Sequence, residues 1–184
     1  FYEGNIGKGN IKKLIANTNA NFISQRTTIK AKQIHYDFIN DEVNVKGSNI
    51  FMEFKEGSIN SDKSLSYNNK DQKIIVNGNV NIKIKNKGDI KAQSVLIDID
   101  KTGSITILKA SKEVEIFLKN LQQKVIADEA KFDIQNSKIN FLGSVVLHQG
   151  KSFLKGDKAF IDLKKGISRI TSSDENSVSG FFKK

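Results

Sequence analysis

The sequence predicts an all-β fold assembled from repeated antiparallel strand pairs, and three observations predict it. Apolar residues occupy every second position in residues 130–134 and again in 139–147, which is the period of a half-buried strand. The polar residues 135–138 between these segments form a turn. The same strand, turn and strand recur along the chain, so one elongated β domain is the simplest architecture.

The repeat is recognised by a small or polar residue that opens each copy. The opening positions follow one another at steps of about 30 to 35 residues, and they are Ala31, Ser61, Ala92, Ala127 and Gly156. Five related strand pairs are therefore expected.

Residues 1–28 precede the repeats and show no clean period. Gly4, Gly7, Gly9 and several asparagines disfavour a long helix. We expect an irregular leader or a loosely held edge strand there, and a single domain over residues 29–184.

Three of the returning strands contain a glycine in their interior, namely Gly47, Gly78 and Gly143, while the third copy has Ala110. An interior glycine usually marks a bend or a close approach of another backbone. Asn77-Gly78 is also a strong hairpin signal, but the inward parity continues across the glycine. A kinked continuous strand is therefore favoured over a hairpin.

Parity assigns the faces of the later elements in order. Residues 50–54 extend the strand that ends at Gly47, Ile107 faces inward together with Ile105, and residues 178–182 form a last short strand. The expected inner face includes Tyr67, Val80, Ile82, Ile97, Ile99, Val114, Ile116, Phe132, Ile134, Phe141, Val145, Leu147 and Ile161.

Composition sets the class of protein. The chain has 184 residues, of which 38% are hydrophobic and 27% charged, which is typical of one globular domain. It has no cysteine, so disulfides and thiolate chemistry are excluded. Because the sequence begins with Phe1 rather than methionine, a signal peptide or an anchor ahead of it stays open.

The net charge of +10 admits two interpretations. It can mark an anionic partner such as nucleic acid or a lipid surface, or it can follow from the coding bias of a chain rich in Lys, Asn and Ile. Single-stranded nucleic acid is bound by exposed aromatic side chains between cations. Because Tyr36, Tyr67 and Phe132 share the inner face, no nucleic acid is expected, although a basic nucleic-acid-binding β protein remains an alternative.

No constellation for catalysis is present. His35 and His148 are isolated on outward positions, and the alternating carboxylates Asp98 and Asp100 fit a solvated strand face. Phosphate-cradling glycine loops and metal-ligand spacings are absent from the sequence. The sequence therefore predicts no enzyme, no metal and no cofactor.

Residues 59–184 resemble the LptA (OstA-like) family of periplasmic lipopolysaccharide transport proteins. The matching segments are INSDKSLSY, IIVNGNVNIKI, IKAQSVLIDI, VIADEAKFDI, KINFLGSVVLHQGKSFLKGDKAFIDL and the tail VSGFFKK. Their order over about two thirds of the chain carries the resemblance.

The resemblance implies an open, V-shaped β-jellyroll whose apolar interior holds the acyl chains of lipid A. It implies interior contacts at Ile116, Phe132 and Ile134, which parity also turns inward. It further implies a periplasmic carrier that moves lipopolysaccharide from the inner to the outer membrane. Expected partners are lipopolysaccharide, other jellyroll components and copies of the same chain joined head to tail. Lysines at the rim of the groove, such as Lys83 or Lys85, are candidates to meet lipid phosphates.

The N-terminus departs from the family pattern, because a further repeat at residues 29–54 and a leader precede the matching region. A relative of the membrane-anchored LptC component is therefore an alternative. A β-solenoid with a closed, side-chain-filled interior is another.

Overall fold

The computed structural model describes residues 11–24, 27–173 and 177–182, and over these residues it is all β, with no helix. The strands are β1 (Lys13–Ile23), β2 (Thr28–Asp37), β3 (Glu42–Lys46), β4 (Ile50–Phe54), β5 (Gly57–Ser61), β6 (Ser64–Asn68), β7 (Lys73–Ile84), β8 (Gly88–Ile99), β9 (Ile105–Leu118), β10 (Gln123–Asp133), β11 (Lys138–Gln149), β12 (Ser152–Asp162), β13 (Ile167–Thr171) and β14 (Ser179–Phe181).

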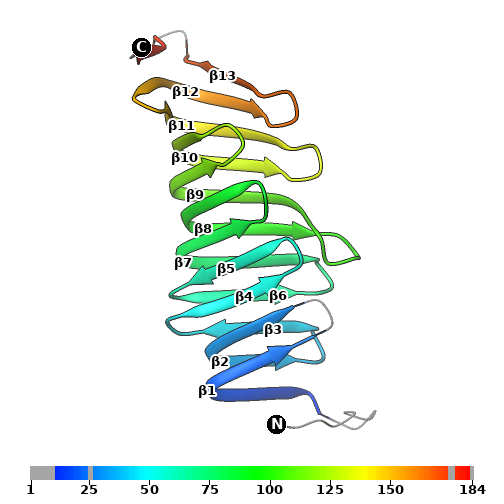
Figure 1. Ribbon diagram of the computed structural model, residues 1–184. Helices are drawn as coiled ribbons and strands as arrows, with labels where there is room; N and C mark the ends of the chain where they lie inside the picture. Colours follow the sequence, from blue (N-terminus) through cyan, green and yellow to red (C-terminus); the bar gives the residue numbers. More distant parts are fainter. Residues whose placement is uncertain (1–10, 25–26, 174–176, 183–184) are drawn as a thin grey trace.

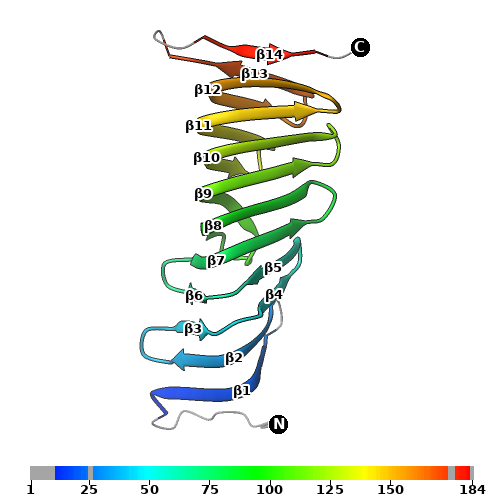
Figure 2. The same cartoon turned by 90° about the vertical axis from the view of Figure 1, so that its left-hand side faces the viewer.

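Antiparallel hydrogen bonds join all fourteen strands into one sheet, whose strands follow one another nearly in chain order. In Figures 1 and 2 the strands are stacked from β1 at the bottom to β13 and β14 at the top. The prediction of repeated antiparallel strand pairs is confirmed.

The sheet is folded along a line of bends in the middle of its long strands. In β7 the bend is Gly78–Asn79, with φ of 86° and 39°, and in β11 it is Gly143–Ser144, with φ of 77° and 46°. Strand pairing shifts register at both places, while β7 and β11 continue across them. The kinked continuous strand predicted at Asn77-Gly78 is confirmed.

The bends divide the sheet into two halves with facing inner surfaces. Half A contains residues 13–17, 33–37, 42–46, 64–68, 73–77, 94–99, 105–111, 129–133, 138–142, 158–162 and 167–171. Half B contains residues 20–23, 28–31, 50–54, 57–61, 80–84, 88–92, 114–118, 123–127, 145–149, 152–156 and 179–181. This arrangement is the V-shaped jellyroll.

Glycine at the bend is required by space as well as by φ. A Cβ at Gly143 would lie 2.3 Å from Oδ2 of Asp128, and one at Gly78 would lie 2.3 Å from Oδ1 of Asp62. These carboxylates accept hydrogen bonds from the next bend residues, Ser144 at 3.1 Å and Asn79. At these two bends, the aspartate that follows the small opening residue of the repeat therefore fixes the bend of the neighbouring strand.

The bend of β9 is at Lys112–Glu113, with φ of 64° and 55°. The assignment of Ala110 as the counterpart of the glycines was therefore wrong. Val114 follows Lys112 by two positions, as Val145 follows Gly143, so Lys112 is the equivalent residue. On the preceding strand Gln93, rather than an aspartate, lies beside this bend, and it donates to Glu113 at 2.7 Å. Lys112 therefore occupies the bend at a positive φ that is strained for a residue with a side chain.

The prediction that residues 50–54 simply extend the previous strand was wrong. The buried residues Val45 and Ile50 are five positions apart, whereas Val76 and Val80 are four apart. At the bend between β5 and β6, Ser61 and Leu65 are four positions apart, whereas the equivalent residues of the uninterrupted strand β8, Ala92 and Val95, are three apart. One extra residue at each bend interrupts the ladder, so that β3 and β4, and β5 and β6, are separate strands.

Within the leader, residues 13–23 form β1, an edge strand that pairs with β2. It contains its own bend at Thr18–Asn19, with φ of 63° and 55°. Residues 1–10, with Gly4, Gly7 and Gly9, lie outside the described residues.

The opening residue of each repeat lies on the inner face of half B beside the bend, where the two halves approach most closely. Cross-strand partners there are Ala31 with Ala20, Ala92 with Val80, and Ala127 with Val114. The recurrence of Ala, Ser or Gly is explained by this confined position.

Away from the bends, parity fails in β9 on the inner face of half A. Register shifts between Asp98 and Ile99 where Thr106 is passed over, and the Thr106 hydroxyl donates to the Asp98 carbonyl at 3.0 Å. Leu108 is consequently buried, and the inward assignment of Ile107 was wrong, because its side chain is only partly buried on the opposite face. At the C-terminus, β14 forms the expected last short strand and pairs with β12.

Candidate functional site

The inner surfaces of the two halves form one continuous apolar cluster. All thirteen residues predicted on the inner face belong to it or pack against it. Half A supplies Tyr67, Ile97, Ile99, Phe132, Ile134, Phe141 and Ile161, and half B supplies Val80, Ile82, Val114, Ile116, Val145 and Leu147. Eleven of them are at most 9% exposed, while Tyr67 and Ile99 are half-buried.

Each half ends in a row of turns, and the gap between the two rows is the mouth of the V. The turns of half A are residues 38–41, 69–72, 100–104, 134–137 and 163–166, and those of half B are 55–56, 85–87, 119–122 and 150–151. Ser24 and Thr27, which are hydrogen-bonded to each other, lie at the same end of half B. Any ligand that reaches the inner face from the side passes between these rows.

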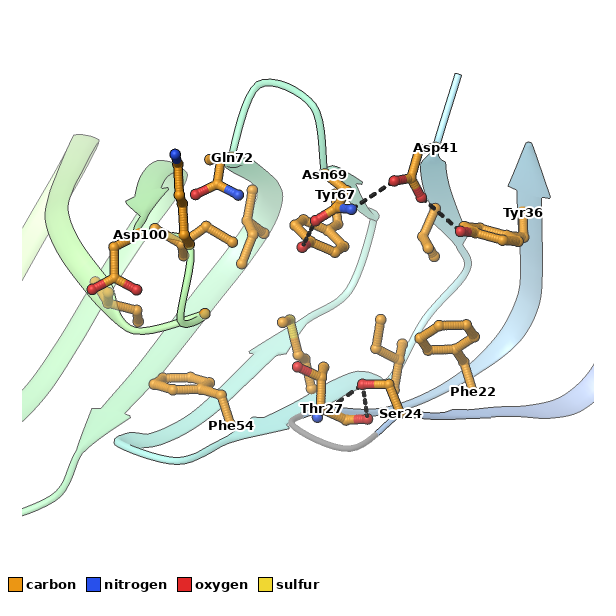
Figure 3. A pocket seen from close by; sticks show the side chains of 18 residues that line it. Phe22, Ser24, Thr27, Tyr36, Asp41, Phe54, Tyr67, Asn69, Gln72 and Asp100 are labelled. Carbon is orange, nitrogen blue, oxygen red and sulfur yellow. Dashed lines mark hydrogen bonds between the residues drawn. The ribbon is translucent and has the colours of Figure 1, made fainter. Parts of the chain in front are cut away.

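A cavity of about 340 Å³ lies at the mouth in the N-terminal third of the molecule (Figure 3). Half A contributes Tyr36, Tyr67 and Ile99 to its wall, and half B contributes Phe22 and Phe54. Of the thirteen predicted residues, Tyr67 and Ile99 line this cavity and the others do not. Its size is that of a small ligand pocket.

The wall of the cavity in half A is a chain of hydrogen bonds. Tyr36 donates to Asp41 Oδ1 at 2.6 Å, Asn69 donates to Asp41 Oδ2 at 2.6 Å, and Tyr67 donates to Asn69 Oδ1 at 2.7 Å. Burial, followed by the bond to Asp41, raises the pKa of Tyr36 to about 12. The bonds from Tyr36 and Asn69 lower the pKa of Asp41. The cavity therefore has a polar rim that stays hydrogen-bonded at neutral pH.

The opposite wall, in half B, is mainly apolar. Ile29, Met52 and Phe54 are buried and face the cavity, and Phe22 packs 6.0 Å from the Tyr36 ring between centroids. Ser24 and Thr27 close the turn of this wall, with the Thr27 amide donating to Ser24 Oγ at 3.1 Å. An amphipathic ligand would find an apolar floor and polar groups at the entrance.

Further along the chain the mouth is bridged by side chains. Lys87, in a turn of half B, donates to the carbonyl of Ile134 in half A at 2.8 Å and lies 5.6 Å from the centre of the Phe132 ring. Ser168 of half A donates to Gln123 of half B at 2.9 Å. Burial is the main cause that lowers the pKa of Lys87. The interior behind these bridges is filled by packed side chains.

The rim lysines differ in position. Lys83 belongs to the outward face of β7, so it is not at the rim as expected. Lys85 lies in the turn of half B and donates to the carbonyl of Lys55, in the same half, at 3.1 Å. The contact of Lys87 across the mouth was not predicted from the sequence, because its partner Ile134 is 47 residues away along the chain.

Two carboxylates from alternating segments of the sequence, Asp100 and Glu115, make structural contacts. Glu115 accepts from Lys124 at 2.7 Å and lies 3.6 Å from Lys91, and the Lys124 bond is the main cause of its lowered pKa. Asp100 Oδ1 accepts from the Thr102 amide at 2.8 Å and closes a turn. Within the described ranges no cluster of His, Cys, Asp or Glu is arranged to hold a metal ion.

Most of the cavity wall was not predicted from the sequence. Phe22 belongs to the segment without a clean period, and Asp41 and Asn69 lie in short polar segments that indicate only turns. Their signal in the sequence was the recurrence of an Asx residue at the end of each half-A strand. That pattern predicts turns, but it does not predict that three turns share one cavity.

Comparisons with known proteins agree with this architecture. The family model described as LptA/(LptD N-terminal domain) LPS transport protein matches residues 58–166 and 124–182. The fold is similar to the crystal structure of LptH, the LptA homologous periplasmic component of the conserved lipopolysaccharide transport device from Pseudomonas aeruginosa. That match has a TM-score of 0.60 and 11% sequence identity, and covers 68% of this chain and 94% of LptH. No curated protein matches the chain. Among the described residues, no helix has the length and apolarity to cross a membrane.

Proposed function

This chain belongs to the LptA and LptD N-terminal-domain family of LPS transport proteins, and from that premise we propose that it is a periplasmic carrier for lipopolysaccharide. In this proposal the acyl chains of lipid A lie between the two halves of the sheet, against the thirteen inner-face residues. No catalytic step is involved. The observation that carries the proposal is the unbroken apolar cluster that runs between the halves from β2 to β12.

The chemistry of the inner face suits a ligand that moves along it. Burial of each CH₂ group contributes about 0.8 kcal/mol wherever it occurs on an apolar surface. The inner face offers similar aliphatic side chains on successive strands, including Ile82, Ile97 and Ile116. An acyl chain therefore meets no strongly preferred position, and a partner that supplies lipid at one end can push it along.

Entry requires the two halves to separate, because the interior beyond the cavity is packed. The cavity at Tyr67 and Ile99 offers the first apolar contact, and its polar rim suits a lipid headgroup. The bends supply the hinge, since Gly78 and Gly143 already occupy positive φ. We therefore expect the mouth to widen beyond the cavity, beside Phe132, as acyl chains enter.

The ends of the sheet support assembly with other jellyrolls. In the described part of the chain β1 pairs only with β2, and β13 and β14 pair only with β12, so both ends have edges open to a further strand. Large apolar side chains are exposed on or beside these edges, and they are Ile11, Leu14, Ile15 and Ile23 at one end and Ile167, Val178, Phe181 and Phe182 at the other. We propose edge-to-edge contact with other bridge components or with copies of this chain.

Site-specific photocrosslinking tests the binding mode. A photoreactive residue at Phe132 is expected to crosslink to radiolabelled lipid A, whereas the same residue at Lys131, on the opposite face, is not. Equal crosslinking at the two positions, or crosslinking at Lys131 alone, would contradict the proposal. Binding to a DNA oligonucleotide that weakens steeply with salt, without lipid crosslinking, would favour the nucleic-acid alternative.

A further inference from the structure

We propose that Lys87 and Lys164 form a phosphate-binding site at the mouth of the V, and that a phosphate group of the lipid occupies it. The inference rests on the proposed function and adds the residues that recognise the anionic part of the ligand. It follows from the contacts that these two lysines make across and along the mouth.

Lys87 crosses the mouth without a carboxylate partner. Its ammonium group donates to one acceptor, the Ile134 carbonyl at 2.8 Å, although an ammonium has three donors. The three ion pairs among the described residues involve other lysines. A partly buried cation that is satisfied only by a neutral carbonyl has a stronger acceptor available in any anion that reaches it.

Lys164 brings a second ammonium group to the half-A turn 134–137, which also holds the acceptor of Lys87. Its ammonium group donates to the carbonyl of Gln135 at 3.4 Å, next along the chain from the acceptor of Lys87. The two ammonium groups are close enough for Lys164 to lower the pKa of Lys87 by repulsion, after the larger effect of burial. Two like charges held at adjacent carbonyls are relieved when a dianion lies between them.

The nearby carboxylate does not neutralise this pair. Both oxygens of Asp133 accept hydrogen bonds from Asn136, at 2.9 Å from its amide and 2.8 Å from its side chain, and these bonds lower the pKa of Asp133. Asp133 is thus held in the turn of half A as a structural group. Lys87 and Lys164 together carry one more charge than Asp133 compensates.

The position of the site matches an amphipathic ligand. Lys87 lies over the Phe132 ring at 5.6 Å, and Phe132 is 2% exposed in the interior. A phosphate held by the lysines would therefore stand at the rim directly above the apolar inner face. Because the phosphate is a stronger acceptor than the Ile134 carbonyl, it draws the Lys87 ammonium group toward itself and weakens the bridge that joins the two halves.

The test compares two lipids that differ only in phosphate. Equilibrium binding of fluorescent diphosphoryl lipid A and of the same lipid after enzymatic removal of both phosphates is measured with the full chain. We expect Lys87→Gln to weaken binding of the phosphorylated lipid about tenfold, in line with the loss of a charge-assisted hydrogen bond. Binding of the dephosphorylated lipid is expected to be unchanged or tighter, because the bridge is removed.

Matched variants separate charge from fold. Lys87→Arg keeps the charge and should retain at least a third of the phosphorylated-lipid affinity, and Lys164→Gln should weaken it to a smaller extent than Lys87→Gln. Lys83→Gln is the control, since Lys83 lies on the outward face of β7, and it should alter neither affinity. Because each variant is judged by the ratio of its two affinities, partial unfolding does not imitate the expected result.

Two outcomes overturn the inference alone: wild-type protein that binds both lipids equally, and Lys87→Gln that weakens both by the same factor. In either case lipid binding persists and the proposed function stands. If wild-type protein binds neither lipid, the proposed carrier function fails and the phosphate site fails with it.

Discussion

The N-terminal and C-terminal parts of the interior are built from the same repeat but differ in what fills them. Near β2, β3 and β4 the halves enclose a cavity of about 340 Å³ with a hydrogen-bonded rim. Near β10 and β11 the interior is packed around Phe132 and the mouth is bridged by Lys87. The alternation of apolar residues is thus sufficient to define an inner face, but not to decide whether that face is open.

Local register explains the difference. One extra residue at the bend before Ile50 separates β3 from β4, and one before Leu65 separates β5 from β6. Among the described strands, this interruption occurs only in the N-terminal part. At its edge of the mouth, half A presents the polar groups of Tyr36, Asp41 and Tyr67 in place of aliphatic side chains. Half A and half B therefore meet less closely there, and space remains.

The largest expected effect comes from truncating one aromatic side chain in each part. Phe132→Ala should lower the free energy of unfolding by about 3 to 5 kcal/mol, because a fully buried ring leaves a cavity that the packed interior cannot collapse. Phe22→Ala should lower it by about 1 to 2 kcal/mol, since that ring is half-buried beside existing space. Urea denaturation measures both, and equal losses would contradict the distinction between the two parts.

The next effect concerns the bends. Gly143→Ala should destabilise the protein by about 1 to 3 kcal/mol, because its φ of 77° is strained for alanine and the new Cβ meets Asp128. Lys112→Gly, at the equivalent bend of β9 with φ of 64°, should instead be neutral or stabilising by up to about 1 kcal/mol. Thermal denaturation of the two variants tests whether Gly143→Ala lowers the stability while Lys112→Gly leaves it unchanged or raises it. Destabilisation by Lys112→Gly as large as that by Gly143→Ala would show that φ does not control the bends.

These bends also show what the sequence could predict. Period-two alternation and the spacing from Ala92 to Ala127 indicate the faces and the repeat, because burial on a pleated strand depends only on parity. A one-residue shift in strand pairing leaves no comparable pattern in the sequence. The bulge at Thr106 and the insertions near Gly47 depend on which backbone groups pair across strands, which composition does not record. For the same reason the Lys87 contact with Ile134 could not be predicted.

A smaller effect is expected at the rim of the cavity. Asp41→Asn should lower the free energy of unfolding by about 1 kcal/mol at neutral pH, because an amide presents one acceptor oxygen to the two donors Tyr36 and Asn69. In wild-type protein the lowered pKa of Asp41 gives a stabilisation present above its ordinary value of 3.8 and lost as pH falls below it. The raised pKa of Tyr36 gives a stabilisation present below 10.0 and lost as pH rises toward about 12.

The pH dependence provides the check. The free energy of unfolding is measured from pH 2 to 12. Its decrease at acid pH and its decrease at alkaline pH should both be smaller in Asp41→Asn than in wild-type protein. Tyr36→Phe should reduce the decrease at alkaline pH. A decrease at alkaline pH that persists unchanged in Tyr36→Phe would assign it to other groups.

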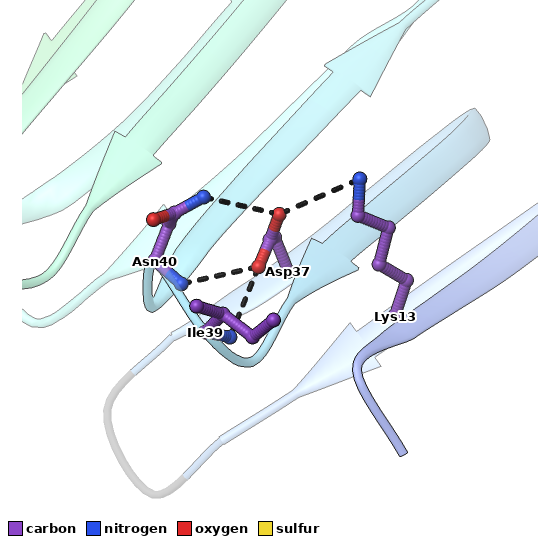
Figure 4. A network of polar contacts seen from close by, with 4 residues as sticks. All are labelled: Lys13, Asp37, Ile39 and Asn40. Atoms are coloured by element: carbon purple, nitrogen blue, oxygen red, sulfur yellow. Dashed lines mark hydrogen bonds and ion pairs between the residues drawn. The ribbon is translucent and has the colours of Figure 1, made fainter. Parts of the chain in front are cut away.

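The smallest effect is expected at the edge strand β1. Lys13 lies 3.7 Å from Asp37 with a side chain that is 69% exposed (Figure 4). The same carboxylate accepts from the amides of Ile39 at 3.0 Å and Asn40 at 3.1 Å, and the Asn40 bond is the main cause of its lowered pKa. Lys13→Gln should leave the thermal midpoint unchanged, whereas Asp37→Ala should lower it, because the turn between β2 and β3 loses its acceptor. A Lys13→Gln midpoint as low as that of Asp37→Ala would make the ion pair the more important contact.

In the proposed carrier, the packed part of the interior opens for lipid, whereas the cavity already has space and keeps its width. Since the chain has no cysteine, spin labels can be attached to cysteines introduced in pairs across the mouth, at Gln122 with Lys165 for the packed part and at Glu56 with Lys101 for the cavity. Electron–electron distance measurements with added lipid A should show a longer distance for the Gln122 and Lys165 pair and little change for the other. An unchanged distance for Gln122 and Lys165 at saturating lipid A would contradict the account.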